Sequence, residues 1–378
     1  PHETVANCLA IYKIKTEMEN QKIRVAITHG DTNGIGYELI FKTFADAEML
    51  ELCTPIIYGS PKIAAYHRKA LDIQGNFSII NSTDEVQDGR INLLTCFDEE
   101  LKVDFGHSNE GSGKAALLAL DKALTDYRHQ AYDVLVNCPI ENKTIHVDGY
   151  PFENIARYLE TSISEGKQTS TLYVSGQQHL LIVTEGAEVK DVTHLLTKKM
   201  IVEKGELLAQ SLQRDFNISN PRIAVLAFNA TNQGEEEQEF IIPAIKTLTE
   251  KGVQVFGPYA AETFFGEGYY EAFDGVLAMY SDQALPTIKA LTTEGVVEFN
   301  ANLPLVATKS SETYGASIAG KGMADAATFR HAIYTAIDIY RNRIAFDEPL
   351  ANPLQKLYHE KHDEGEKTRF SVSKKRNE

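Results

Sequence analysis

Three short segments hold residues that could bind phosphate or metal. Gly34-Ile35-Gly36 precedes a helical pattern, a context in which backbone N–H groups bind phosphate. Leu39 stands where a dinucleotide fingerprint needs its third glycine, so a tight strand-to-helix turn is the favoured interpretation. Segment 315–321 has the spacing GxxxxGK, but Gly322 replaces the Ser or Thr that would hold Mg²⁺. His359-Glu360-Lys361-His362 lacks zincin spacing and is interpreted as a solvated face.

The distribution of histidine limits the metal chemistry that we expect. No histidine occurs between His194 and His331, although two strong strand patterns end within that interval. Catalytic groups and ligands of parallel α/β domains gather at such strand ends. The second of these ends offers Asp282, a candidate ligand for a hard metal ion. We therefore predict no transition-metal site.

Strands and helices must position these residues. The sequence predicts them from apolar runs that alternate with helical patterns. The predicted strands are 23–28, 55–60, 133–136, 180–184, 222–228 and 275–280. The predicted helices include 37–50, one that starts at Pro61, and 200–215. This alternation indicates an α/β fold with a largely parallel sheet, and the number of units indicates two lobes.

The length of 378 residues suits two domains. We predict an extension over 1–21, a first lobe of 22–136 plus 304–345, a second lobe of 137–303, and a charged tail over 346–378. The extension lacks the pattern of a signal peptide, and we expect it to have no role in the fold.

The composition limits which binding partners and which cellular compartment we expect for the protein. With 53 Asp+Glu against 37 Lys+Arg, the net charge is −16, which disfavours nucleic-acid and membrane partners. No apolar run approaches the length of a membrane helix. The four cysteines form no CxxC pair, as expected of a cytoplasmic protein.

Several motifs, in order along the chain, resemble those of the 4-hydroxythreonine-4-phosphate dehydrogenase family of pyridoxal phosphate biosynthesis. The resemblance covers about residues 22–345. The segments that carry it are 28–36, Asn137-Cys138-Pro139-Ile140, 256–261, Ala278-Met279-Tyr280-Ser281-Asp282-Gln283, and 318–322. It implies a homodimer of two-lobed α/β/α subunits of the isopropylmalate-dehydrogenase type, with the active site in a cleft between the lobes. It also implies NAD⁺ as hydride acceptor and a divalent metal held by three histidines, which assists oxidation and decarboxylation.

The chain departs from this family pattern at the metal ligands. The resemblance places the first metal histidine at Gly186 and the third at Ser281. The second belongs to a loop that here begins Asn229-Ala230-Thr231-Asn232. Glycine and alanine offer no side-chain lone pair, and Thr and Ser are poor ligands for transition metals.

Substrate-binding positions differ as well. Asn154-Ile155-Ala156-Arg157 replaces a Gly-His-Thr-Glu sequence, and Ser311-Glu312-Thr313-Tyr314 replaces an Asp-His-Gly-Thr sequence near the cofactor. Glu298 and Ala307 align with the substrate-binding asparagine and arginine, whereas the phosphate-binding lysine is retained as Lys289. A lost arginine–phosphate contact and an added carboxylate oppose an anionic substrate.

Three functions follow from the sequence. In the first, a degenerate paralogue keeps the fold and dimer but loses the dehydrogenase reaction, and it binds a phosphorylated metabolite, regulates, or pairs with an active relative. In the second, an active enzyme of the same fold acts on a different phosphorylated substrate and uses a Mg²⁺-type site built from Asp282, Lys289, Glu185, Glu262 and Glu298. In the third, the family activity is retained. We predict that the activity is lost or changed, with Lys289 and Asp282 binding substrate and no catalytic residue assigned.

Overall fold

The computed structural model describes residues 22–97, 101–145 and 152–351. The predicted extension over 1–21, residues 352–378 of the predicted tail and the 359–362 motif lie outside the described residues. No helix in the described part of the chain is both long enough and apolar enough to span a membrane.

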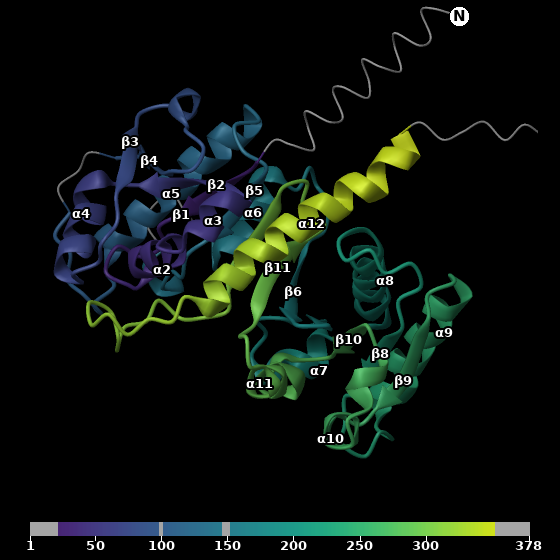
Figure 1. The fold of residues 1–378 in the computed structure, drawn as a ribbon. Helices are drawn as coiled ribbons and strands as arrows, with labels where there is room; N and C mark the ends of the chain where they lie inside the picture. Colours follow the sequence, from purple (N-terminus) through teal and green to yellow (C-terminus); the bar gives the residue numbers. More distant parts are fainter. Residues whose placement is uncertain (1–21, 98–100, 146–151, 352–378) are drawn as a thin grey trace, which may run out of the picture.

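A single mixed sheet of twelve strands runs through the described molecule (Figure 1). Its strand order is β3-β4-β2-β1-β5-β12-β11-β6-β7-β10-β8-β9. The first half holds β1 (Ile23–Thr28), β2 (Cys53–Gly59), β3 (Phe77–Ile80), β4 (Ile91–Thr95), β5 (Val134–Asn137) and β12 (Val306–Ser310). The second half holds β6 (Ser170–Ser175), β7 (Gln178–Ile182), β8 (Ile223–Leu226), β9 (Val255–Tyr259), β10 (Gly275–Ala278) and β11 (Val297–Ala301).

The sheet is largely parallel, as predicted, and the antiparallel pairs lie together at its middle. Only β11 with β12, β11 with β6, and β6 with β7 are antiparallel among the described pairs. Of the two predicted boundaries between the lobes, 303/304 falls in the turn between β11 and β12, whereas 136/137 falls inside β5. The division into lobes stays a prediction.

Helices cover both faces of the sheet. They are α2 (Gly36–Phe44), α3 (Ala47–Leu52), α4 (Pro61–Ala70), α5 (Glu110–Arg128), α6 (Ile155–Ile163), α7 (Val192–Leu195), α8 (Lys198–Arg214), α9 (Ile242–Glu250), α10 (Ala261–Gly266), α11 (Ser281–Leu291) and α12 (Ala327–Ala351). One apolar core joins side chains of α2, α8, α9 and α12 across both halves. Two smaller cores hold α5 with α6, and α10 with α11. Helix α12 packs on β5, β11 and β12 and reaches α8, so it bridges the two halves (Figure 1).

Local sequence explains where elements begin and end. The apolar run of β1 is buried on both faces, which is typical of a central parallel strand. The predicted helix over 37–50 is instead two helices, because Asp46 caps α3 by accepting a hydrogen bond from the Glu48 N–H. Helix α12 continues to Ala351, so the first residues of the predicted tail are helical.

The loop before α2 is a packed turn, which supports the turn interpretation over a phosphate site. The N–H of Ile35 donates to the carbonyl oxygen of Tyr314 at 3.1 Å, so residue 314 covers this helix start. A Cβ on Gly36 would lie 2.0 Å from the carbonyl oxygen of His29. Only glycine therefore allows this close approach of the backbones.

Gly36→Ala is expected to lower the free energy of unfolding by about 1–3 kcal/mol, the usual cost of overpacking. Gly266→Ala is the matched control, because its added Cβ would meet no atom within 4 Å. The control should be neutral or stabilising, since alanine favours helices. Urea unfolding checks both variants, and equal stabilities would contradict the packed turn.

Candidate functional site

A cavity of about 650 Å³ lies where the two halves of the sheet meet. Described residues from both halves line it: Asn137 and Cys138 at the end of β5, residues 153–157 at the start of α6, Thr171 and Tyr173 of β6, residues 183–187 after β7, Lys204 of α8, Ser281 at the start of α11, Glu298 and Asn300 of β11, and Lys309 of β12. This volume is in the range of pockets for small metabolites.

Strand pairing places four polar side chains in one row across the cavity wall. Lys309 is paired with Asn137 of β5 and with Glu298 of β11, and Glu298 is paired with Tyr173 of β6. Directly paired residues lie side by side on one face of a sheet. At one end of the row, the Thr28 hydroxyl donates to Asn137 Oδ1 at 2.8 Å and fixes the amide.

Glu185 is exposed as a whole residue, but its carboxylate is hydrogen-bonded to the cavity wall. Its Oε1 accepts a hydrogen bond from the Tyr173 hydroxyl at 2.6 Å. Partial removal of the carboxyl group from water raises the pKa of Glu185 above its ordinary value, and the nearby charge of Glu298 adds to this. Hydrogen bonds from Tyr173 and Thr171 and the charge of Lys204 oppose it. Burial, and then the Glu185 charge, raises the pKa of Tyr173 as well. The Glu185 carboxyl and the Tyr173 hydroxyl therefore form one hydrogen-bonded pair in the cavity wall.

The basic side chains of the cavity already have partners. Lys309 Nζ lies 2.9 Å from Glu298 Oε2, and Arg157 Nη1 lies 2.6 Å from Glu160 Oε2. Lys204 Nζ donates to the Ser170 hydroxyl and to the Thr169 carbonyl oxygen. Burial lowers the pKa of Lys204, which the charges of Glu185 and Glu160 oppose.

The residues at the implied metal positions do not fit a transition-metal centre. Gly186 and Ser281 line the cavity, whereas Thr231 is exposed and is not among the residues that line it. Across residues 22–97, 101–145 and 152–351, no three His, Cys, Asp or Glu side chains are grouped to hold an ion. In the loop after β8, the Glu237 carboxylate accepts hydrogen bonds from the N–H groups of Asn229 and Gly234, both at 2.7 Å. The Glu237 carboxylate therefore holds the loop from Asn229 to Gly234 in place.

The structure brings together only some of the predicted site residues. Glu185 and Glu298 both face the cavity. Asp282 and Lys289 are exposed on α11 outside the cavity lining, and Lys289 Nζ donates to the Ser311 carbonyl oxygen at 3.1 Å. Glu262 is exposed on α10 and does not line the cavity either. Substrate binding by Asp282 and Lys289 stays a prediction.

Sequence reasoning did not identify Tyr173, Lys204 or Lys309. For Lys204 a signal exists, because it lies three residues after Ile201 and four before Leu208, on the apolar side of α8. A lysine within a buried stripe is unusual enough to mark a site. Tyr173 and Lys309 gain their place from strand register, which the sequence alone does not reveal.

Together the fold and the cavity define a two-halved α/β protein with a polar cavity at the junction. The family model described as pyridoxal phosphate biosynthetic protein PdxA matches residues 51–336. The chain belongs to this family.

Relatives and a solved structure agree with this assignment. The chain is 46% identical to a 4-hydroxythreonine-4-phosphate dehydrogenase from Bacteroides thetaiotaomicron, over 94% of this chain and 99% of the relative. It is 32% identical to the same enzyme of Sulfurihydrogenibium sp., over 85% of this chain and 99% of the relative. A crystal structure of a 4-hydroxythreonine-4-phosphate dehydrogenase from Burkholderia phymatum matches with a TM-score of 0.68 and 25% identity, covering 85% of this chain and 99% of the other.

Proposed function

We propose that this member of the family binds a small polar metabolite in the junction cavity but has lost the metal-dependent dehydrogenase reaction. One observation carries this proposal: Gly186 and Ser281 face the cavity at two positions where the resemblance implies metal-binding histidines. Neither residue can hold a transition metal as an imidazole does. Without the ion, the alcohol pKa is not lowered and the charge that develops as CO₂ leaves is not stabilised.

A magnesium-type site built from the predicted carboxylates has less support. Of those residues, Glu185 is bound by the Tyr173 hydroxyl and Glu298 is paired with Lys309. Asp282 and Glu262 lie outside the cavity lining. The five side chains therefore do not converge on one point, as the octahedral coordination of Mg²⁺ would require.

The test is NAD⁺ reduction by the purified full chain with 4-phosphohydroxythreonine, in the presence of Zn²⁺, Co²⁺ or Mg²⁺. The Bacteroides thetaiotaomicron relative, under the same conditions, is the positive control. We expect a rate at least about a thousandfold below the control, since metal-ion catalysis contributes several kcal/mol to such reactions. A rate within a few fold of the control would overturn the proposal.

NAD⁺ binding and the homodimer stay predictions of the resemblance. Segment 311–314, which the resemblance places near the cofactor, packs against the turn before α2 through the Ile35–Tyr314 hydrogen bond. Calorimetric titration with NAD⁺ and sedimentation of the free protein would test these two predictions separately from turnover.

A further inference from the structure

We propose that the junction cavity selects a small ligand that carries an amino group and no phosphate, with Glu185 binding the amino group and Glu298 turning phosphate away. This inference rests on the proposed function, because it names the class of metabolite that the cavity binds. It departs from the phosphorylated metabolite that the sequence predicts.

The charge of the cavity opposes a phosphorylated ligand. Of the described lining residues, four are carboxylates and three are cations: Glu153, Glu160, Glu185 and Glu298 against Arg157, Lys204 and Lys309. Phosphate sites in proteins offer Arg, Lys or backbone N–H groups that are free to bind the anion. A phosphate dianion would enter a cavity in which acids outnumber bases, and like charges at short range repel.

Glu298 competes with any phosphate for one cation of the cavity, Lys309. Its carboxylate holds Lys309 Nζ at 2.9 Å, and only 18% of the Glu298 side chain is exposed. Strand pairing fixes both residues opposite each other on β11 and β12, so the lysine cannot leave without breaking a partly desolvated ion pair. A phosphate would therefore have to displace a carboxylate that the sheet holds in place.

The other two cations also have partners within this chain, although 64% of the Arg157 side chain is exposed. Arg157 is paired with Glu160 at 2.6 Å. Lys204 donates to Ser170 and Thr169 on the neighbouring strand segment, and the charges of Glu185 and Glu160 act on it. Each cation of the described lining thus has a partner within this chain.

An ammonium group, unlike a phosphate, is expected to bind favourably at Glu185. The hydrogen bonds to this carboxylate come from the hydroxyls of Tyr173 and Thr171, which carry no charge. Glu298 lies near enough for its charge to act on Glu185, and the charge of Lys204 acts on it less strongly, so two acids and one cation share this part of the cavity. A positive group between them relieves their repulsion and forms charge-assisted hydrogen bonds.

Three probes that differ by one group each would test the selection, titrated calorimetrically into the full chain near neutral pH. They are 4-hydroxythreonine, its 4-phosphate ester, and threonate, in which a hydroxyl replaces the amino group. We expect 4-hydroxythreonine to bind at least about tenfold more tightly than either of the others, as the loss of one charge-assisted contact implies. Tightest binding of the phosphate ester or of threonate, or no binding of any probe at millimolar concentration, would overturn the inference.

Two variants assign the roles of the acids. Glu298→Gln frees Lys309 and should strengthen binding of the phosphate ester about tenfold. Glu185→Gln should weaken 4-hydroxythreonine about tenfold and leave threonate nearly unchanged. Glu250→Gln, at an exposed position on α9 outside the cavity, makes the same change in net charge and should alter none of the affinities.

Failure of this inference can be distinguished from failure of the proposed function. Unchanged affinities in Glu298→Gln and Glu185→Gln would overturn the inference. A protein that prefers the phosphate ester but does not reduce NAD⁺ overturns only the ligand class. A protein that reduces NAD⁺ at the rate of the active relative overturns the proposed function itself.

Discussion

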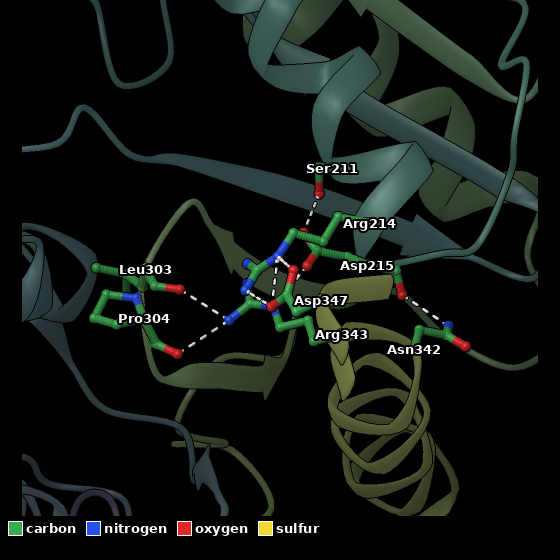
Figure 2. Close-up of polar contacts among 8 residues, drawn as sticks. All are labelled: Ser211, Arg214, Asp215, Leu303, Pro304, Asn342, Arg343 and Asp347. Carbon is green, nitrogen blue, oxygen red and sulfur yellow. Dashed lines mark hydrogen bonds and ion pairs between the residues drawn. The ribbon is translucent and has the colours of Figure 1, made fainter. Parts of the chain in front are cut away.

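Replacing Arg343 with alanine is expected to lower the free energy of unfolding by about 3–5 kcal/mol, the usual cost of breaking a buried ion pair. Figure 2 shows the Arg343 guanidinium between α8 and the turn that joins β11 to β12. Its Nε lies 2.6 Å from Asp215 Oδ1, with only 6% and 4% of the two side chains exposed. Its Nη1 donates to the carbonyl oxygens of Leu303 at 2.9 Å and Pro304 at 3.2 Å.

The size of this effect follows from what alanine leaves behind. Asp215 would keep the hydrogen bond from the Ser211 hydroxyl, at 2.6 Å, but would stay buried without its cation. The two carbonyl oxygens would lose their donor as well, and unsatisfied buried groups are costly. Because the arginine lies on α12 and Asp215 follows α8, the loss would fall on the contact that joins the two halves of the sheet.

A neighbouring pair supplies the matched control. Arg214 and Asp347 form an ion pair in the same cluster (Figure 2), but 38% and 47% of their side chains are exposed. Arg214→Ala should therefore cost no more than about 1 kcal/mol, as is usual for surface pairs. Urea unfolding of both variants makes the comparison, and equal costs would show that burial does not strengthen the Arg343 contact.

Acid is expected to destabilise the protein through three buried histidines. Burial lowers the pKa of His29, His67 and His179 to about 4 each, and the charge of His67 also lowers that of His29. Histidine in an unfolded chain titrates near 6.5. Between these two values the unfolded chain binds more protons than the folded one, so stability falls as the pH falls. The loss begins near pH 6.5 and is complete near pH 4.

Between pH 7 and pH 5 each histidine should remove about 2 kcal/mol of stability. Burial raises the pKa of Asp31, Glu185 and Glu312, and these carboxyl groups act in the opposite direction. The net loss should therefore be smaller than the sum for three histidines.

A substitution at His179 tests the contribution of a single histidine to the pH dependence of stability. Its Nδ1 lies 2.8 Å from the Asp274 carbonyl oxygen, and its ring packs on Phe216 with 4.1 Å between centroids. Asparagine can place an N–H near Nδ1 but does not titrate, so His179→Asn should reduce the change in stability between pH 7 and pH 5 by about 2 kcal/mol. The exposed His194 of α7 is the control, and His194→Asn should leave the pH dependence unchanged. Parallel curves for wild type and His179→Asn would contradict the assignment.

The sequence predicted strands where apolar residues follow one another without interruption. The runs at 23–28 and 275–280 became β1 and β10, because a strand buried on both faces must be apolar throughout. Strands β3, β4, β9 and β12 were not among the predictions, and neither were the antiparallel strands β6 and β11. Strands β6 and β11 share one reason. Each carries polar residues that face the cavity, so neither gives a continuous apolar signal.

By itself the sequence determined the α/β class, the largely parallel sheet and the chemical identity of the residues at the implied metal positions. These depend on side-chain type and on periodicity within one segment. Only the tertiary structure decided that Tyr173, Glu298 and Lys309 lie in one row and that Lys289 lies outside the cavity lining. The reason is that strand register and helix placement depend on contacts between separate elements, and local patterns carry little information about these.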